Sequence, residues 1–410
     1  MRPGFFWCKG NRAGVWHGMW MRSLNGESDG KGKMKEKLRL AVFGHKRWSR
    51  EGGVEIVVKE LCTRMAQQGC QVTCYNRSGH HVSGAEYDDA GKTEYEGIRQ
   101  KSVPTIERRG LAAVSSSFFA AVCSAFGRYD VVHIHAEGPA FFAWIPKLFG
   151  EKVVVTIHGL DWQREKWKAG LGSKFIRQGE RNAVKYADGI IVLSKGVQEY
   201  FRDTYGRKTF FIPNGVNRPE IRREEFINQK FGLTKDSYIL FLGRLVPEKG
   251  LQYLIKAFKS VNTEKKLVIA GGSSDTDSFI KELKELARDD QRIIFTGFVQ
   301  GQLLDELYSN AYIYTLPSDL EGMPLSLLEA MSYGNCCLVS DIPECIEVVE
   351  DKAIVFKRSD INDLRDKLQD ACDNFKMVSE LKQHAADYIC SKYNWDEVVE
   401  ETLNVYGSEK

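Results

Sequence analysis

The sequence lacks an apolar run long enough to span a membrane. Its most apolar stretch, Leu111 to Phe126, is about 16 residues long and holds four serines, whereas a transmembrane helix needs roughly 20 apolar residues. The first 33 residues contain neither a continuous apolar core nor a small-residue cleavage site, so no signal peptide is predicted. We expect residues 1–36 to be a disordered extension, with Met34 as the natural start.

The ten cysteines do not have the spacing of a metal site. Cys62, Cys70 and Cys74 are too scattered, and Cys336-Cys337 is a doublet rather than a C-x-x-C motif. Most cysteines lie within apolar runs, as free structural thiols do, which indicates a reducing compartment and a cytoplasmic protein. Asp275-Thr276-Asp277 matches the D-x-D motif of metal-binding sites. Because it follows glycines and serines at the expected start of a helix, we interpret it as a helix N-cap.

The sequence also lacks a strong excess of charge of one sign. The formal net charge is +3, so the total does not indicate a nucleic-acid partner. The charges are unevenly distributed, with eleven Lys/Arg against four Asp/Glu between Lys31 and His80 and nine against thirteen over residues 351–410. The basic first part suits either an anionic surface such as phospholipid headgroups or an ordinary solvated surface.

What the sequence does contain is an alternation of short apolar runs with stretches of helical periodicity, such as Val54–Gln68 and Phe175–Tyr186. The runs lack strict alternation of polar and apolar residues, which is typical of strands buried on both faces of a parallel sheet. The first series is Leu38–Gly44, Val72–Tyr75, Val131–His135, Val153–His158 and Gly189–Leu193. The second series is Tyr238–Leu242, Leu267–Ala270, Ile293–Phe295, Tyr312–Leu316, Cys337–Val339 and Ala353–Phe356. Two such series predict an α/β protein with two doubly wound, Rossmann-like domains.

A turn marks the boundary between the two series. Ile212-Pro213-Asn214-Gly215-Val216 carries proline and Asn-Gly turn signals, and a charged stretch follows it. We therefore expect a first domain over 37–217 and a second over 218–388. Because ligands bind at the carboxyl ends of parallel strands, two such sheets that face each other predict a cleft between them.

Two turns of the first domain carry candidate site residues. Gly52-Gly53 opens a helix, where backbone amides and the helix dipole favour a phosphate, although a plain tight turn is an equal alternative. His158 follows a buried strand and is expected to point into the cleft, the alternative being a loop histidine that bonds a carbonyl. Trp162 and Trp167 are candidates for an acceptor-sugar platform or for a cover of the loop.

In the second domain, Arg244 and Lys249 follow the first strand, with a proline turn between them and a helix starting near Gly250. Two cations at a strand end beside a helix N-terminus suit a diphosphate. A solvated loop with two charges is the alternative, and by themselves the two residues favour it.

The segment from Ser318 to Met331 is the strongest local motif. Glu321 lies in a loop, Pro324 suits the first turn of the helix that follows, and Glu329 lies within that helix among apolar residues. A carboxylate on an apolar face needs a partner, which ligand hydroxyls or a structural salt bridge would supply. The amides of three neighbouring residues are available for anionic oxygens: Gly322, Met323 and Leu325.

Together these residues resemble glycosyltransferase family 4. The pair Glu321 and Glu329 resembles that family's paired-glutamate motif, and Arg244 and Lys249 resemble its cation pair. The first-loop glycines Gly52-Gly53 and the sugar-side His158 also match, in an arrangement that runs from about Leu38 to Trp395. The stretch from His158 to Trp167 further resembles a rhamnosyltransferase-like subgroup that makes bacterial surface polysaccharides.

The resemblance implies a GT-B fold, with an acceptor domain, a donor domain and a C-terminal helix (389–410, with Trp395) that packs back on the first domain. It implies that Arg244 and Lys249 hold the donor diphosphate, helped by the amides after Glu321. Glu329 would bind the ribose and Glu321 the donor sugar, and His158 would lie near the reacting carbon. Val299 would lie near the base, while Gly52-Gly53 would approach the diphosphate from the first domain.

The resemblance also implies the reaction and its partners. The enzyme would be a retaining hexosyltransferase that needs no metal and no cofactor, with a UDP-, dTDP- or GDP-linked sugar as donor. The acceptor would be a saccharide, in particular one linked to polyprenyl diphosphate, which places the enzyme at the inner face of the plasma membrane. Candidate membrane contacts are the basic loop His45–Arg50 and the apolar segment Leu111–Phe126, whose alternatives are a flank of the diphosphate loop and a buried helix.

Three alternative functions can be compared by the residues and the activity that each would need. A GT-B-like nucleotide-sugar epimerase would turn over donor without an acceptor and would need further carboxylates and histidines around the sugar. A non-catalytic nucleotide-binding module would not need all five charged or polar site residues. A nicotinamide-dependent dehydrogenase is disfavoured because the first strand–helix turn lacks the spaced glycines of the G-x-G-x-x-G motif.

Overall fold

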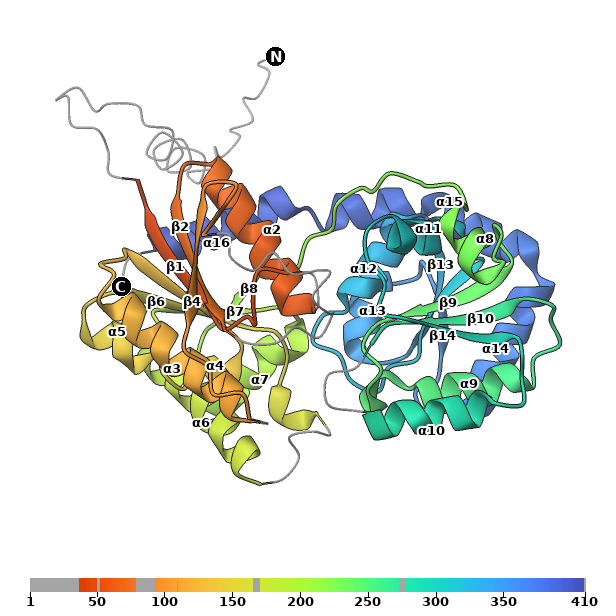
Figure 1. The fold of residues 1–410 in the computed structure, drawn as a ribbon, viewed down its shortest axis with the longest axis horizontal. Helices are drawn as coiled ribbons and strands as arrows, with labels where there is room; N and C mark the ends of the chain where they lie inside the picture. Colours follow the sequence, from red (N-terminus) through yellow and green to blue (C-terminus); the bar gives the residue numbers. More distant parts are fainter. Residues whose placement is uncertain are drawn as a thin grey trace, which may run out of the picture.

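The computed structural model describes residues 37–49, 52–78, 93–108, 110–164, 170–272 and 277–408. It forms two α/β lobes side by side, each built on a mainly parallel sheet with helices on both faces (Figure 1). The predicted fold class, two Rossmann-like domains, is confirmed. The prediction for residues 1–36 lies outside the described residues.

The first sheet has eight strands in the order β3-β4-β2-β1-β5-β6-β7-β8. Only the β3–β4 pair of this sheet is antiparallel in the described part of the chain. The strands are β1 (Arg39–Phe43), β2 (Gln71–Arg77), β3 (Glu94–Tyr95), β4 (Ile98–Val103), β5 (Val131–His135), β6 (Lys152–Ile157), β7 (Gly189–Val192) and β8 (Phe210–Phe211). β3, β4 and β8 are strands that the apolar runs of the sequence do not predict.

Helices cover both faces of this sheet because neighbouring residues of a strand point to opposite sides. Leu40 and Val42 of β1 pack in one core cluster with α2 (Gly53–Gln67) and α16 (Trp395–Gly407). Ala41 and Phe43 pack in another cluster with the helices of the opposite face. Those helices are α3 (Leu111–Ala125), α4 (Glu137–Ala140), α5 (Trp144–Leu148), α6 (Leu171–Tyr186) and α7 (Lys195–Tyr205).

The second sheet has six parallel strands in the order β11-β10-β9-β12-β13-β14 and a single core cluster. The strands are β9 (Tyr238–Leu242), β10 (Lys266–Ala270), β11 (Ile293–Gly297), β12 (Ile313–Leu316), β13 (Cys336–Ser340) and β14 (Ile354–Phe356). The helices are α8 (Phe226–Phe231), α9 (Leu251–Lys259), α10 (Asp277–Ala287), α11 (Gln302–Asn310), α12 (Leu325–Ser332), α13 (Pro343–Val349), α14 (Ile361–Asp373) and α15 (Phe375–Lys392).

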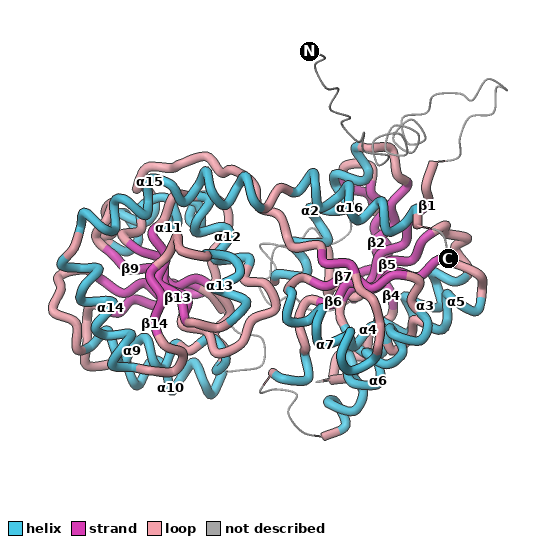
Figure 2. The backbone as a smooth tube through the Cα atoms, turned by 180° about the vertical axis from the view of Figure 1, so that it is seen from behind, coloured by secondary structure: helices cyan, strands magenta, loops and turns pink. Residues whose placement is uncertain are grey.

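The chain crosses between the lobes twice. After α15, which packs on α12 and β13, it returns to the first lobe, where α16 packs against α2 and β6 (Figure 2). Val216 on the outward crossing pairs with Asn394 on the return, so the two crossings lie side by side. Trp395 opens α16 and is buried in the core of the first domain.

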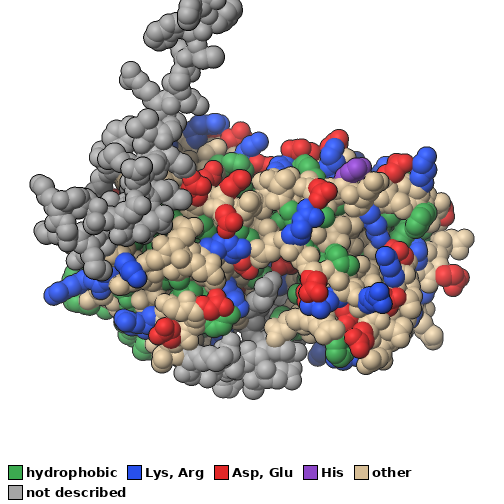
Figure 3. Space-filling model, turned by 90° about the horizontal axis from the view of Figure 1, so that it is seen from above, with side chains coloured by type: hydrophobic (Ala, Val, Ile, Leu, Met, Phe, Trp, Pro, Cys, Tyr) green, Lys and Arg blue, Asp and Glu red, His purple; other side chains and the backbone are tan. Residues whose placement is uncertain are grey.

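None of the described helices has both the length and the apolarity to cross a bilayer. Seen from above, acidic and basic side chains are interspersed across the molecule, with no field of one sign on this face (Figure 3).

Candidate active site

The carboxyl ends of the two sheets meet where three strands end: β6 of the first domain and β9 and β12 of the second. His158-Gly159 follows β6, and Gly322 follows β12. A Cβ on Gly322 would collide with the carbonyl oxygen of His158, and a Cβ on Gly159 would lie 3.0 Å from the Cα of Gly322. The two backbones therefore touch, and the cleft between the domains is closed at this point.

A small cavity lies beside this contact. Four residues predicted for the donor site line it from the second domain: Arg244, Lys249, Glu321 and Gly322. Leu320 and Glu248 complete that side, while Gly159, Leu160 and Arg164 line it from the first domain. The structure thus brings together residues that are up to 163 positions apart in the sequence, between Gly159 and Gly322.

Lys249 and Glu321 form an ion pair in this cavity. The Lys249 Nζ lies 2.6 Å from Glu321 Oε1, and the two side chains are only 12% and 8% exposed. Ser318 Oγ donates a second hydrogen bond to the same carboxylate oxygen at 2.6 Å. The sequence assigned Lys249 to a diphosphate and Glu321 to a sugar, and it gave no sign that the two residues bind each other.

Arg244 follows β9, and its side chain is exposed in the cleft. Desolvation by the surrounding protein lowers the pKa of its guanidinium, and the positive charge of Arg164 lowers it further, while Glu248 and Glu321 act in the opposite direction. Arg164 comes from the first domain and forms an ion pair with Asp161, whose Oδ1 lies 3.0 Å from Arg164 Nε. The cavity therefore has three cationic side chains around it, from both domains.

His158 is held by a second histidine that sequence reasoning missed. His135, at the end of β5, places its Nδ1 2.9 Å from His158 Nε2, and the two rings are tilted by 31°. Burial, together with the charge of Arg164, lowers the pKa of His158 to about 3, so its imidazole is neutral at pH 7. Because His135 occupies Nε2, the ring presents Nδ1 as the nitrogen for any other partner.

The histidine row continues away from the cleft. The ring of His133 lies 4.2 Å from that of His135, and its two nitrogens bond Thr156 Oγ1 and the hydroxyl of Tyr406 on α16, each at 2.7 Å. His133 is 1% exposed, and burial lowers its pKa to about 3. The pattern that would have indicated this row is the alternate spacing of His133 and His135 on one face of β5.

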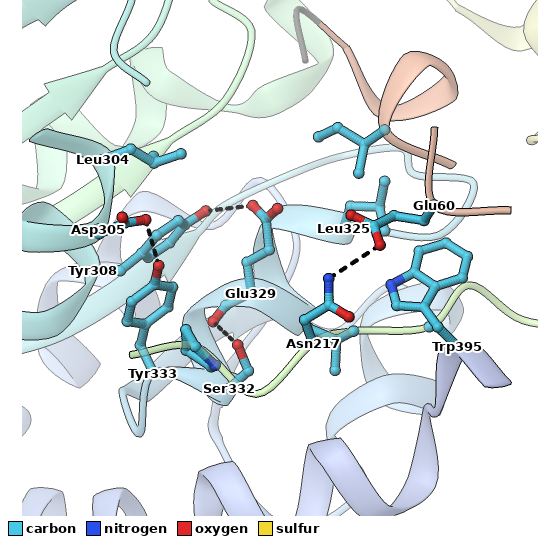
Figure 4. Close-up of a pocket in the computed structure, with 14 residues that line it drawn as sticks. Glu60, Asn217, Leu304, Asp305, Tyr308, Leu325, Glu329, Ser332, Tyr333 and Trp395 are labelled. Carbon is cyan, nitrogen blue, oxygen red and sulfur yellow. Dashed lines mark hydrogen bonds between the residues drawn. The ribbon is translucent and has the colours of Figure 1, made fainter. Parts of the chain in front are cut away.

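Glu329 faces a different cavity (Figure 4). Its carboxylate accepts a hydrogen bond from the Tyr308 hydroxyl at 3.2 Å, and the Tyr308 ring stacks on Tyr333 at 5.1 Å between centroids. This cavity is lined by α11, α12 and the crossing segment, and also by Ile56 and Glu60 of α2. The two predicted glutamates thus open on two cavities, and the ribose-binding role of Glu329 stays a prediction.

The glycines of the first loop lie opposite the start of α12. Gly52 is the N-cap of α2 and Gly53 its first residue, and a Cβ on Gly53 would lie 3.4 Å from Leu325 Cδ1. Leu325 packs on the cores of both domains. Pro324 differs slightly from the expectation: it is the N-cap of α12 in extended conformation, one residue before the first helical turn. Two helix N-termini therefore face each other across the closed cleft.

The other predicted site residues that the structure describes do not line the cavity of Arg244 and Lys249. Met323 lies at the interface, where its sulfur is 2.9 Å from the amide of Asn214. Val299 is buried in the core of the second domain, and its position near a base stays a prediction. Trp162 packs under the guanidinium of Arg177 and donates to Glu180. Trp167 and the segment 273–276 lie outside the described residues.

The two candidate membrane contacts differ. All side chains of 45–49 are buried or half-buried: His45 bonds Asn76, and Trp48 packs against Tyr95 with ring centroids 5.3 Å apart. This packing argues against a docking role for that loop. The remaining candidate membrane contact is α3, which has one buried face and one exposed face.

Two Rossmann-like domains that meet at the carboxyl ends of their strands form the GT-B fold, the architecture of a large class of glycosyltransferases. Comparisons with known proteins agree. The chain matches the family model "Glycosyltransferase Family 4" over residues 51–218 and "Glycosyl transferases group 1" over residues 223–388. The protein belongs to glycosyltransferase family 4 and is a glycosyltransferase, as the sequence predicted.

Three similar proteins illustrate the likeness. An uncharacterized glycosyltransferase of Methanocaldococcus jannaschii is 29% identical, over 68% of this chain and 75% of its own. The UDP-Gal:alpha-D-GlcNAc-diphosphoundecaprenol alpha-1,3-galactosyltransferase of Escherichia coli is 26% identical, over 68% and 75%. The crystal structure of HepE from Anabaena, in complex with UDP and glucose, superposes with a TM-score of 0.75 at 14% identity and covers 91% of this chain and 100% of that one.

Proposed function

We propose that this glycosyltransferase moves a hexose from a UDP-sugar to a saccharide carried on polyprenyl diphosphate, with retention of anomeric configuration and without a metal ion. The product would extend a bacterial surface or capsular polysaccharide. The observation that carries the proposal is the cavity at the closed cleft, where Arg244, Lys249 and Glu321 face His158-Gly159 of the other domain.

In this cavity the cations would bind the donor's diphosphate. Arg244 and Lys249 lie after β9 and next to Gly322, at the carboxyl edge where ligands of doubly wound sheets bind. Their charges would stabilise the leaving nucleotide as the glycosidic bond breaks, which is the role a divalent ion plays in other transferases. This arrangement supports metal independence.

Donor binding would exchange the partners of the Lys249–Glu321 ion pair. Lys249 would turn to phosphate oxygens and Glu321 to sugar hydroxyls, so that the charge of each side chain remains paired. The UDP base is proposed by analogy with the UDP-dependent relative from Escherichia coli and with HepE. GDP and dTDP are the alternatives.

The chemistry would occur on one face of the sugar. The acceptor hydroxyl would attack the anomeric carbon from the side of the leaving diphosphate, whose phosphate oxygen would take the hydroxyl's proton. His158 would contact the donor sugar as a neutral imidazole through Nδ1, since its Nε2 is bonded to His135. This route retains configuration without a covalent enzyme intermediate.

A lipid-linked acceptor fits an apolar surface on the first domain. Six large side chains there are 37–73% exposed. They lie on or beside α3 and α5, which pack together: Leu111, Phe118, Phe126, Trp144, Leu148 and Phe149. The Phe126 and Phe149 rings lie 5.0 Å apart, so exposed side chains from beside the two helices meet at one end of this surface, called here the α3/α5 face. We propose that it rests on the phospholipid of the inner leaflet.

A transfer assay tests the proposal. The protein would be incubated with radiolabelled UDP-glucose, UDP-galactose or UDP-N-acetylglucosamine and a short-chain polyprenyl diphosphate that bears one N-acetylglucosamine. The expected product is a disaccharide lipid with an α-linkage from an α-linked donor, formed in EDTA and abolished in Arg244→Ala. Epimerisation of the donor sugar without transfer would support the alternative function of an epimerase. Binding of the donor without any turnover would support a non-catalytic nucleotide-binding module.

A further inference from the structure

We propose that Arg164 is a third cation for the donor's diphosphate, supplied by the first domain and in place only when the cleft is closed. This inference rests on the proposed function and extends it, because the two expected cations, Arg244 and Lys249, both belong to the second domain. Arg164 lies at the end of a short 3-10 turn, Asp161–Gln163, and lines the same cavity as both of them.

The electrostatics of the cavity support an anionic ligand at this point. The Arg164 charge lowers the pKa of Arg244, so the two guanidinium groups repel each other. Asp161, Glu248 and Glu321 raise the pKa of Arg164. Glu321, however, is already paired with Lys249. Asp161 and Glu321 already balance the charges of Arg164 and Lys249. An anion between Arg164 and Arg244 would relieve the repulsion between them, and the oxygens of a diphosphate can bind guanidinium groups from both domains.

The backbone of the Arg164 loop is anchored rather than loose. The Asp161 amide donates to Glu137 Oε2 at 2.8 Å, and Glu137 is completely buried at the start of α4. Asp161 in turn holds Arg164 Nε at 3.0 Å. The guanidinium is therefore fixed relative to the first domain, and its distance from Arg244 depends on how the domains are placed.

This arrangement would couple leaving-group stabilisation to closure. With the domains apart, the diphosphate would meet two cations. With Gly159 against Gly322, it would meet three. As the bond from the anomeric carbon to the diphosphate oxygen breaks and the bond to the acceptor oxygen forms, the released negative charge would be shared by all three cations, while the proton passes to the phosphate. Hydrolysis in the open state would be slower for the same reason.

The test compares Arg164→Ala and Arg164→Lys with wild type by steady-state kinetics and by calorimetric titration with UDP and UMP. The matched control is Arg202→Ala, because the Arg202 side chain is 64% exposed on α7 of the same domain and does not line the cavity. We expect Arg164→Ala to lower kcat about 10²-fold with a small change in donor KM. We also expect the UDP-over-UMP affinity ratio to fall about 10-fold while UMP affinity is kept, with partial rescue in Arg164→Lys.

Two results would overturn the inference alone. One is unchanged kcat and an unchanged UDP-over-UMP ratio in Arg164→Ala. The other is an equal loss of UMP and UDP affinity together with a lower melting temperature, which would show that Arg164 only holds its loop through Asp161. If wild type binds neither UDP nor any other nucleoside diphosphate, the proposed function fails first and this inference fails with it.

Discussion

The two domains supply the site in different ways. The second domain contributes groups from two short segments, Arg244–Lys249 and Glu321–Leu325, each at the end of a strand and the start of a helix. The first domain contributes single residues from separate turns: Gly53 of α2, His158 after β6 and Arg164 beyond it. One half of the site is local in the sequence, and the other half is assembled by packing.

The interiors of the two domains differ as well. Buried tyrosines such as Tyr308, Tyr312 and Tyr314 fill the second core, whereas buried histidines, His133 and His135, line the first beneath the site. Most of the exposed large apolar side chains in the described part of the chain also belong to the first domain. The buried histidines beneath the site and most of the exposed apolar surface are therefore features of the first domain.

The largest effect is expected from Gly322→Ala, which attacks the contact between the domains. The added Cβ would collide with the His158 carbonyl oxygen, so the closed cleft could not form. Transfer should fall by about 10³-fold, because groups of both domains would no longer meet on the donor. UDP affinity should fall about 10-fold, as in Arg164→Ala, because Arg164 would no longer reach the diphosphate. The melting temperature should change little, since each domain keeps its own core.

Gly196→Ala is the matched control, because a Cβ on Gly196 of α7 meets nothing within 4 Å and the position is helical. It should transfer sugar like wild type. Normal kcat in Gly322→Ala would show that transfer does not need the closed contact.

The next effect concerns the ion pair of the second domain. Lys249→Met leaves the Glu321 carboxylate largely buried without its cation, which should lower the free energy of unfolding by about 2–3 kcal/mol. Lys249→Met/Glu321→Gln removes both charges and should recover about half of that loss. Urea unfolding at pH 7 measures both. Equal stability of the single variant and wild type would mean that the pair contributes nothing.

A smaller effect should distinguish the first domain by its acid sensitivity. The pKa of His133 is about 3 in the folded protein and about 6.5 in the unfolded chain, so the unfolded state binds more protons between these values. The contribution of the buried, neutral imidazole to the stability of the fold is therefore fully present above pH 6.5, and it is lost as the pH falls toward 3. Protonation of this histidine in the unfolded state should lower the free energy of unfolding by about 1.4 kcal/mol between pH 7.5 and pH 5.5.

The measurement is the difference between wild type and His133→Gln in urea unfolding at the two pH values, which cancels the contributions of all other groups. The variant should lose about 1.4 kcal/mol less than wild type on acidification. His384→Gln, on the exposed surface of α15, serves as the control. Parallel pH profiles for wild type and His133→Gln would rule out this role for the buried imidazole.

The smallest effect is expected at the α3/α5 face. Phe149→Asp should weaken binding to vesicles with 30% anionic phospholipid by about 5-fold, since half of a phenylalanine side chain leaves the bilayer interface. Phe375→Asp should have no effect, although this phenylalanine of the second domain is 64% exposed against 54% for Phe149. Vesicle co-sedimentation measures both, and equal losses would remove the distinction between the domains.

Three residues that the sequence proposed for the donor site, Arg244, Lys249 and Glu321, line one cavity from the second domain. They could be proposed from the sequence because each follows an apolar strand, and their binding roles stay predictions. The sequence did not predict that Lys249 pairs with Glu321, since the two residues are 72 positions apart and only the fold brings them together. His135 was missed for the same reason: its partner His158 comes directly after the neighbouring strand β6, 23 positions further along the chain.

The missed strands have local causes. β4, Ile-Arg-Gln-Lys-Ser-Val, has four polar residues and pairs near the edge of the sheet, so it lacks the apolar run used as the signal. β3 and β8 have two residues each, too few for any periodicity. The strands that the sequence did predict lie in the interior of a sheet or carry a continuous apolar run, where burial on both faces determines composition.

The most direct test of the central claim is nucleotide binding without metal. UDP, GDP, dTDP and ADP would be titrated in EDTA against wild type, Arg244→Ala and the control Arg288→Ala, whose arginine is 68% exposed on the same domain. At about 100 times its dissociation constant a bound nucleotide adds about 2.7 kcal/mol of stability. The account predicts that UDP raises the melting temperature of wild type and Arg288→Ala but not of Arg244→Ala. No shift with any nucleotide, or an undiminished shift in Arg244→Ala, would contradict it.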